Sequence, residues 1–243
     1  MQTAILAGGL ASRLGALAAQ RPKYLLDVAG RPFADHQLAW LADSGVEGVV
    51  LCVGHLGDQI RAFVGDGERW GLAVTYVDDG PRLLGTAGAL RAALDAGLLE
   101  PAFAVLYGDS YLELDPRSVW EDFEARRPSA LMCTYRNRGR WDASNARVGG
   151  GLVTRYEKGL TDPAAAGMDQ IDYGLAILDR DLVGAEIAAG QPADLADLYT
   201  RLAERGLLAA HEVGGRFYEI GSEQGLAELD ALLRERAASE PPR

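Results

Sequence analysis

Short apolar runs alternate with stretches of helical spacing along the first half of the chain. We predict strands at 3–7, 46–53, 72–77 and 102–107, and helices at 33–44, 57–64 and 85–96. Glycine follows the first and the last of these helices, as is common where a helix ends. Strands that alternate with helices in this way predict a mostly parallel sheet covered by helices on both faces.

The second half has a less regular pattern. We predict helices at 117–126, 181–189, 193–204 and 223–236, and strands at 130–135, 151–158, 168–178, 209–213 and 217–220. A polar stretch occupies 136–146. With no internal repeat and no low-complexity linker, we read this half as a continuation of the same sheet. The 243 residues therefore predict one α/β domain, a Rossmann-like three-layer αβα sandwich with a mixed, mostly parallel sheet.

Composition narrows the possible partners. The formal net charge of −11 disfavours DNA and RNA, whose binding depends on neutralising phosphates with Lys and Arg. No apolar stretch approaches the ~20 residues that span a bilayer, and the first residues do not resemble a signal peptide. Cys52 and Cys133 both lie in apolar runs, which predicts reduced core thiols and a cytoplasmic protein.

A glycine-rich loop follows the first predicted strand. Gly8 and Gly9 would let backbone N–H groups approach phosphate oxygens, and Arg13 and Lys23 supply two cations nearby. The pattern is neither the Walker A loop nor a strict dinucleotide fingerprint. These residues alone leave open a simple strand-to-helix turn with surface cations.

The run of 28 residues from Leu6 to Phe33, LAGGLASRLGALAAQRPKYLLDVAGRPF, resembles the signature of the sugar-1-phosphate nucleotidyltransferase family. The resemblance implies that the loop binds a nucleoside triphosphate. It further implies that Arg13 grips the β- and γ-phosphates and that Lys23 stabilises the transition state at the α-phosphorus. Arg13, Lys23 and Asp109 are the catalytic residues that we expect.

A second segment that matches the family is Gly85-Thr86-Ala87-Gly88, which opens a predicted helix. Small residues at a helix N-terminus permit close backbone approach. The resemblance places this segment beside the nucleobase. The predicted nucleotide-binding residues are Leu6, Ala7, Gly8, Gly9, Arg13, Lys23, Asp79, Gly85, Thr86, Ala87 and Gly88.

Asp109 ends a predicted strand, where a carboxylate can hold a hard cation. A strand-end Asp is also common as a turn or cap residue. Family members bind Mg²⁺ with this Asp and with a second Asp from a late D-I-G turn, where this chain has Glu219. We therefore predict a Mg²⁺ site on Asp109 and Glu219, with Mn²⁺ as a substitute.

The acceptor side is predicted from a Glu-Lys pair and a glycine, Glu157, Lys158 and Gly174, which the family places against a sugar phosphate. The stretch from Trp141 to Asn145 resembles W-D-x-S-N in members thought to act on heptose or mannose phosphates, although a surface loop explains it equally well. The predicted sugar-phosphate-binding residues are Asp109, Ser110, Asn145, Glu157, Lys158, Asp172, Tyr173 and Gly174.

The sequence thus predicts an enzyme that transfers a nucleoside monophosphate to a sugar 1-phosphate and releases pyrophosphate. Residues 1–110 would bind the nucleotide and 111–238 the sugar phosphate, with 239–243 as a disordered tail. The chain looks most like heptose 1-phosphate and mannose-1-phosphate guanylyltransferases, which favours GTP. We expect small-molecule substrates, no nucleic acid, no membrane, and a monomer or homodimer.

Three other functions stay open. A phosphocholine-type cytidylyltransferase would share the amino-terminal signature but should present aromatic rings to its cationic substrate. A glycosyltransferase of related fold should carry a D-x-D metal motif, which 107–110 lacks. A catalytically inactive nucleotide-sugar sensor would fit the Glu at position 219, although the presence of Arg13, Lys23 and Asp109 argues against it.

Overall fold

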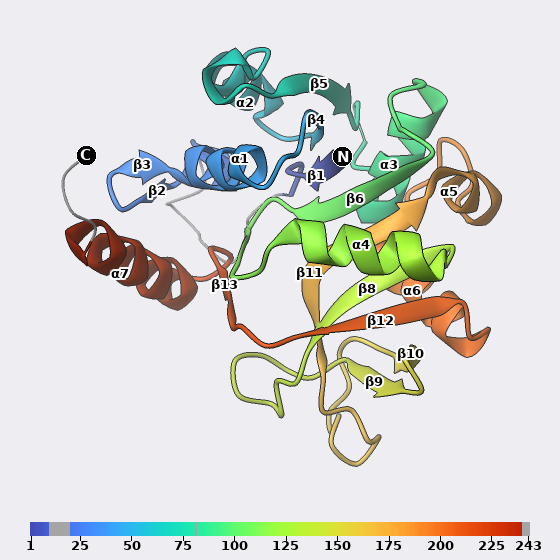
Figure 1. Cartoon of the computed structure of the whole chain (residues 1–243). Helices are drawn as coiled ribbons and strands as arrows, with labels where there is room; N and C mark the ends of the chain where they lie inside the picture. The colour runs from blue at the N-terminus through green and yellow to red at the C-terminus, as the bar shows by residue number, and fades with distance from the viewer. Residues whose placement is uncertain (10–19, 81, 240–243) are drawn as a thin grey trace.

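The computed structural model describes residues 1–9, 20–80 and 82–239 (Figure 1). Its centre is a nine-stranded sheet with the order β5-β4-β1-β6-β11-β8-β12-β10-β9. The strands of this sheet are β1 (Gln2–Leu6), β4 (Gly48–Val53), β5 (Ala73–Asp78), β6 (Ala102–Tyr107), β8 (Ala130–Tyr135), β9 (Ala146–Gly149), β10 (Leu152–Tyr156), β11 (Ile171–Asp179) and β12 (Leu208–Val213).

The four strands β5, β4, β1 and β6 are all parallel. Their register pairs Leu6 of β1 with Cys52 of β4 on one side and with Tyr107 of β6 on the other. The carboxyl ends of these strands therefore lie at one edge of the sheet. Ligands of open α/β sheets bind outside this kind of edge.

The other part of the sheet is mixed. Strand β11 inserts between β6 and β8 and is antiparallel to both, whereas β12 pairs with β8 in parallel. Strands β10 and β9 complete the sheet with antiparallel pairing. The pairing of β11 with β8 shifts register between Asp172 and Ala176, so the strand is irregular where it passes the predicted acceptor residues.

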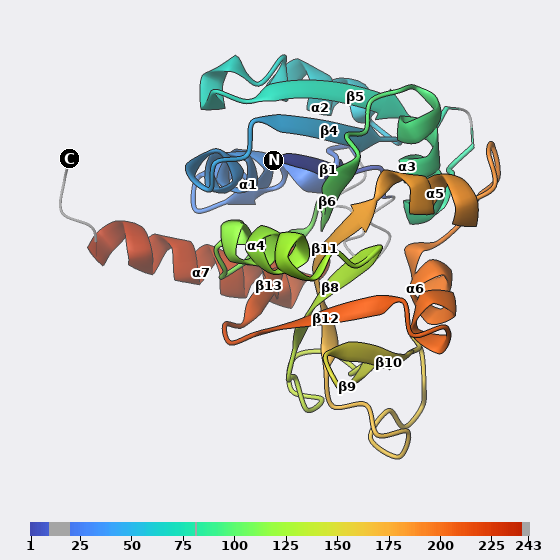
Figure 2. The same ribbon diagram turned by 45° about the vertical axis from the view of Figure 1, so that its right-hand side comes forward.

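Helices cover both faces of the sheet, as predicted (Figure 2). One apolar core joins the sheet to the helices α1 (Phe33–Asp43), α2 (Gly57–Val64), α4 (Pro116–Arg126) and α7 (Glu223–Ser239). The other core joins it to α3 (Gly85–Asp95), α5 (Arg180–Glu186) and α6 (Leu195–Glu204). Ala4 and Ile5 of β1 face opposite cores because successive side chains of a strand alternate. The three-layer αβα sandwich is thus confirmed.

The sequence prediction includes a strand at 217–220 but lacks the other short elements of the fold. Strands β7 (Ser110–Leu112) and β13 (Phe217–Glu219) form a separate two-stranded ribbon, as do β2 (Asp27–Val28) and β3 (Arg31–Pro32). Two 3₁₀ turns, η2 (Lys23–Leu25) and η3 (Glu68–Trp70), were also not predicted. Pieces of two or three residues carry too little periodicity to be recognised, and only the segment of β13 was read as strand-like.

The end of the chain differs slightly from the prediction, since α7 runs to Ser239 and the remaining tail, 240–243, lies outside the described residues. Both cysteines are free and buried, as expected. Among the described helices, none combines the length and apolar character that crossing a membrane requires.

Candidate active site

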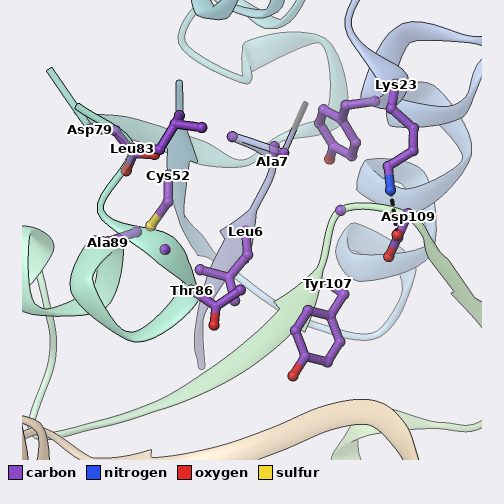
Figure 3. Close-up of a pocket in the computed structure, with 15 residues that line it drawn as sticks. Leu6, Ala7, Lys23, Cys52, Asp79, Leu83, Thr86, Ala89, Tyr107 and Asp109 are labelled. Atoms are coloured by element: carbon purple, nitrogen blue, oxygen red, sulfur yellow. Dashed lines mark hydrogen bonds and ion pairs between the residues drawn. The ribbon is translucent and has the colours of Figure 1, made fainter. Parts of the chain in front are cut away.

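The carboxyl ends of the parallel strands surround a cavity of about 220 Å³ (Figure 3). Its walls combine the glycine loop after β1, the turn after β6 and the start of α3. The lining residues are Leu6, Ala7, Gly8, Gly9, Lys23, Tyr24, Cys52, Asp79, Leu83, Gly85, Thr86, Ala89, Tyr107, Gly108 and Asp109. The structure therefore gathers most of the predicted nucleotide-binding residues around one space.

Lys23 and Asp109 meet at one end of this cavity. Lys23 begins η2 after Pro22, whose extended backbone brings the chain to the cavity mouth, and Asp109 lies in the turn after β6. The Lys23 Nζ donates to Asp109 Oδ2 across 2.6 Å, and both side chains are partly buried. The predicted catalytic cation and the predicted metal ligand thus form an ion pair.

The turn that carries Asp109 is held by the side chain of Gln37, a residue that the sequence did not lead us to predict. Gln37 of α1 is 1% exposed, and its Nε2 donates to the carbonyl oxygens of Tyr107 at 3.0 Å and Ser110 at 2.9 Å. These two carbonyls flank Asp109. A buried polar residue in the middle of a helix was a signal that could have drawn attention to it.

The other end of the cavity is formed around Asp79, which follows β5. A side-chain carbon at Gly8 would lie 3.1 Å from the Gly54 backbone nitrogen and 3.2 Å from Asp79 Oδ2, so the loop after β1 packs closely against this carboxylate. Burial raises the pKa of Asp79 to about 6, and a hydrogen bond from the Leu84 backbone offsets part of that effect. Asp79 is therefore a half-buried acceptor that titrates near neutral pH.

Apolar surface completes this end. Cys52, Leu83 and Ala89 line the cavity beside Asp79, and Leu83 is 41% exposed (Figure 3). Flat apolar walls with one convergent carboxylate suit an aromatic ring that carries polar edges. None of these three is among the predicted site residues, because Cys52 and Ala89 read as ordinary core positions and Leu83 falls between predicted elements.

The start of α3 departs from expectation in part. Gly85 has φ +71°, and a side-chain carbon there would lie 2.6 Å from the Ala193 carbonyl oxygen. The backbone N–H groups of Ala87 and Gly88 donate to that same oxygen, at 3.0 and 3.2 Å. Gly85 and Thr86 line the cavity, but Ala87 and Gly88 lie behind its wall. The helix amides of Ala87 and Gly88 therefore bind the chain itself, and the role of these two residues in nucleotide binding stays a prediction.

Three of the residues predicted to bind the sugar phosphate, Asn145, Lys158 and Gly174, lie near Asp172 of β11. Its carboxylate accepts from the Tyr107 hydroxyl at 3.4 Å, the Tyr156 hydroxyl at 3.3 Å and the Gly174 N–H at 3.0 Å. Burial raises the pKa of Asp172, and the positive charge of Lys158 offsets part of that effect. Tyr107 also lines the nucleotide cavity, so it connects the two sides of the site.

Gly174 stands where β11 is irregular. Its φ is +96°, and a side-chain carbon would lie 3.0 Å from Ser110 Oγ. Asn145 is 9% exposed, and its Oδ1 accepts from the backbone N–H of Asp172. The irregular strand therefore brings Ser110, Asn145 and Asp172 together through short contacts that larger residues at position 174 would prevent.

The chain has only two lysines beside 22 arginines, and both lysines are predicted site residues. Lys158 is exposed and its Nζ lies 5.7 Å from the centre of the Tyr107 ring. Glu157 pairs instead with Arg155, at 2.8 Å. Lysine presents a compact, strongly hydrated charge that suits a phosphate oxygen.

Tyr173 does not face the site. It is 1% exposed, and its ring packs edge-on against Phe217. Its hydroxyl accepts from the Glu113 N–H and donates to the Arg216 carbonyl oxygen, each at 3.1 Å. Strand alternation thus points the Tyr173 side chain into the core, and the role of this residue in binding the sugar phosphate stays a prediction.

Glu219 approaches Asp109 through the β7–β13 ribbon. Glu219 pairs with Ser110, and the Ile220 N–H donates to the Asp109 carbonyl oxygen at 2.9 Å. The Glu219 side chain lines an adjoining hollow and its Oε1 accepts from Ser222 Oγ at 3.0 Å. In the described part of the chain, no three His, Cys, Asp or Glu side chains cluster as metal ligands. Two carboxylates with substrate phosphates are nevertheless the usual ligands of Mg²⁺, so this donor set fits that cation.

Arg13, the remaining predicted catalytic residue, lies outside the described residues. The model of the MobA-like NTP transferase domain matches residues 3–235 of the chain. The chain belongs to this family. That match covers both sides of the site, and it confirms at the level of the family what the glycine loop and the P-K segment suggested.

Two curated relatives and one solved structure show the range of this resemblance. CMP-5'-(3-aminopropyl)phosphonate synthase from Streptomyces rubellomurinus is 40% identical over 114 residues, 46% of this chain and 18% of that protein. UTP–glucose-1-phosphate uridylyltransferase from Synechocystis is 25% identical over 221 residues, 85% of this chain and 56% of that protein. A Bacillus anthracis structure, provisionally described as a glucose-1-phosphate thymidylyltransferase, superposes with a TM-score of 0.83 at 23% identity, covering 97% and 96% of the two chains.

The NTP transferase domain here spans 18% to 56% of the length of the curated relatives it matches. The names of these relatives differ in nucleobase and in acceptor. The solved structure establishes the fold, which is the nucleotidyltransferase α/β fold with a large mixed sheet.

Proposed function

We propose that this protein transfers a nucleoside monophosphate from a nucleoside triphosphate to a sugar 1-phosphate, with release of pyrophosphate. The observation that carries the proposal is the Lys23–Asp109 pair at the end of a glycine-lined cavity. A cation and a carboxylate placed together at strand ends are the two groups that triphosphate chemistry needs, one for phosphate oxygens and one for a divalent cation.

The chemistry needs no covalent intermediate. A phosphate oxygen of the acceptor, already ionised, attacks the α-phosphorus in line, and a new P–O bond forms. The bond from the α-phosphorus to the oxygen that bridges to the β-phosphorus breaks, and pyrophosphate leaves with that electron pair. Positioning and charge neutralisation supply most of the rate in such transfers.

The residues divide this work. Lys23 neutralises charge that develops around the α-phosphate, and Lys158 holds the phosphate of the acceptor. Asp109 and Glu219 would hold Mg²⁺, which when bound supplies positive charge between the reacting phosphates. The Lys23–Asp109 pair at 2.6 Å places the cation for the phosphate oxygens directly beside the carboxylate for the divalent cation.

We extend the proposal to GTP as the donor and a mannose or heptose 1-phosphate as the acceptor. Asp79 supports guanine, since one carboxylate can accept both the N1–H and the N2–H of that base. Uracil and thymine present a single N–H between two carbonyl oxygens, which a carboxylate repels. The segment 141–145 resembles the motif W-D-x-S-N. This resemblance supports a mannose or heptose 1-phosphate as the acceptor.

The test is a pyrophosphate-release screen of GTP, CTP, UTP, dTTP and ATP against a panel of sugar 1-phosphates. We expect GTP with mannose or heptose 1-phosphate to give the highest kcat/KM. Asp109→Ala should abolish release while thermal unfolding shows a folded protein. Full activity in this variant would refute the assignment of the site. Activity with another base would retain the reaction and overturn only the choice of donor.

A cytidylyltransferase for a phosphonate or phosphocholine acceptor is the second candidate. The similarity to the phosphonate synthase of Streptomyces rubellomurinus favours it. CTP with 3-aminopropylphosphonate or phosphocholine therefore belongs in the screen. If no pair of substrates releases pyrophosphate while GTP still binds, the protein is a nucleotide sensor and not an enzyme.

A further inference from the structure

The side chain of Tyr107 contacts both sides of the site. Tyr107 is the last residue of β6 and lines the nucleotide cavity. Asp109 follows two residues later, so the two Cα atoms lie at most about 7 Å apart. In Figure 3, Tyr107 lies on the same side of the cavity as the Lys23–Asp109 pair and away from Asp79. Tyr107 is therefore at the end of the cavity proposed for the phosphates and not at the end proposed for the base.

Three contacts link Tyr107 to residues that are predicted to bind the sugar phosphate. The Lys158 Nζ lies 5.7 Å from the ring centre, within the ~6 Å range of a cation–π interaction. The hydroxyl donates to Asp172 Oδ2 at 3.4 Å. A side-chain carbon at position 174 would lie 3.5 Å from Cδ2 of the ring, so the ring packs against the backbone of Gly174. One ring thus borders the nucleotide cavity and contacts the acceptor side.

Tyr107 is held at both of its ends. The carboxylate that accepts from its hydroxyl is itself fixed, because Asp172 also accepts from the Tyr156 hydroxyl at 3.3 Å and from the Gly174 N–H at 3.0 Å. The Tyr107 carbonyl oxygen accepts from the buried Gln37 side chain at 3.0 Å. The ring between these two anchors is a rigid surface.

Lys158 lacks such support from its own position in the chain. It is exposed, it follows the end of β10 by two residues, and it carries its ammonium on a flexible four-carbon stem. A ligand that must order a flexible side chain loses part of its binding free energy. The ring of Tyr107 restricts this ammonium group before the ligand binds, and the Asp172 carboxylate attracts it.

We propose that Tyr107 is a positioning residue whose ring holds the Lys158 ammonium beside the phosphate end of the nucleotide cavity. The inference rests on the proposed transfer, in which Lys158 holds the phosphate of the acceptor. A phosphate bound there has its oxygen next to the α-phosphate that Lys23 neutralises, as in-line attack requires. Tyr107 therefore acts on the acceptor through Lys158.

A double-mutant cycle tests whether Tyr107 acts through Lys158. Steady-state kinetics with GTP and α-D-mannose 1-phosphate, or with the pair that the screen selects, measure kcat/KM for the sugar phosphate. We expect Tyr107→Leu to lower it about tenfold in the parent protein and less than about twofold in a Lys158→Gln background. Equal losses in the two backgrounds would show that the ring acts independently of Lys158 and would overturn the inference.

Further variants separate the ring from the hydroxyl and from aromatic packing in general. Tyr107→Phe keeps the ring, so kcat/KM should stay close to the parent value. A loss as large as that of Tyr107→Leu would assign the effect to the hydroxyl and overturn the inference. If thermal unfolding shows that Tyr107→Leu is not folded, Tyr107→Met takes its place in the cycle.

The chain offers a matched control in Tyr76. The Arg61 guanidinium lies 4.5 Å from the centre of the Tyr76 ring, which is not among the groups that line the nucleotide cavity. Tyr76→Leu therefore removes a ring that carries a cation elsewhere, and kcat/KM for the sugar phosphate should not change. A loss equal to that of Tyr107→Leu would mark the effect as general and overturn the inference.

Amine labelling separates this inference from the proposed reaction, because it needs no turnover. The ring covers one side of the Lys158 ammonium, so without substrates Tyr107→Leu should raise the labelling rate of Lys158 about threefold relative to the amino terminus. Tyr107→Phe should not raise it. An unchanged rate in Tyr107→Leu overturns the inference whether or not the protein releases pyrophosphate. A raised rate in a protein that releases no pyrophosphate with any pair of substrates supports the contact and overturns the proposed reaction.

Discussion

The nucleotide side and the acceptor side of the site are built in different ways. The nucleotide cavity uses residues at the carboxyl ends of four parallel strands, which the sheet gathers at one edge. The acceptor side uses Asn145, Lys158 and Asp172, which come from antiparallel strands and the loops between them. The carboxyl ends of parallel strands lie at one edge of the sheet, whereas those of antiparallel strands alternate between its two edges. The first side can therefore be derived from chain order and the second depends on local contacts.

The largest expected effect is a loss of kcat when Lys23 loses its charge. Lys23→Gln removes the cation at the α-phosphate, and we expect kcat to fall about 10²–10³-fold. Pyrophosphate release at saturating substrates measures it. Unfolding should barely change, because the Lys23–Asp109 pair is partly exposed to solvent. A kcat above one-tenth of the parent value would remove Lys23 from the reaction.

The matching change on the acceptor side replaces Lys158. It should weaken binding of the sugar phosphate and leave binding of the triphosphate unchanged. Lys158→Gln loses a charge-assisted hydrogen bond, so we expect KM for the sugar phosphate to rise about 10–100-fold. KM for the triphosphate should stay constant. Steady-state kinetics with each substrate varied in turn measures both values. A larger effect on the triphosphate than on the acceptor would break the division between the two sides.

Having two lysines in the chain permits a direct test of the same division. An amine-selective reagent can modify Lys23, Lys158 and the amino terminus. Triphosphate should protect Lys23 several-fold, and sugar phosphate should protect Lys158. Peptide mass spectrometry of the labelled protein gives the ratio. Protection of both lysines by one substrate would show that the two sides are not separate.

A subtler effect concerns how Asp109 is positioned. Gln37→Met keeps the size of the side chain but leaves the carbonyls of Tyr107 and Ser110 without their donor. We expect the Mg²⁺ concentration for half-maximal activity to rise about tenfold, with KM for the triphosphate little changed. Gln59→Met on α2 makes the same replacement at an exposed glutamine and controls for the change of residue type alone. Equal losses at all Mg²⁺ concentrations would indicate a purely structural role.

The smallest expected effect is a pH dependence of nucleotide binding. The pKa of Asp79 is raised to about 6 by burial, so the carboxylate is ionised above that pH and protonated below it. Only the ionised form accepts two N–H groups from guanine. KM for GTP should therefore rise several-fold between pH 7 and pH 5, and Asp79→Asn should flatten the profile. An unchanged slope in Asp79→Asn would assign the titration to another group.

The sequence predicted much of the first side for physical reasons. The helix at 57–64 and the strands at 102–107 and 130–135 have the bounds that periodicity predicted. Asp79, Gly85 and Thr86 line the cavity, and the family resemblance rather than periodicity singled them out. The same reasoning could not reveal that the backbone N–H groups of Ala87 and Gly88 donate to the Ala193 carbonyl oxygen, about a hundred residues away in the sequence.

The acceptor side was harder to predict. Strand alternation could have shown that Tyr173 points away from Asp172 and Gly174. The contacts of Asn145 and the position of Gln37 depend on tertiary neighbours that one sequence does not reveal. The family relation and the fold are established, and the roles of the individual residues remain predictions that the experiments above address.

The insertion of β11 between β6 and β8 restricts how this protein can be recombined. A break near residue 110 would separate β6 from β11, its antiparallel neighbour in the centre of the sheet. Two fragments cut there would each expose an unpaired edge strand, which favours aggregation. An exchange of acceptor specificity between relatives should therefore transplant surface loops such as 137–145, with the central strands of the recipient kept together.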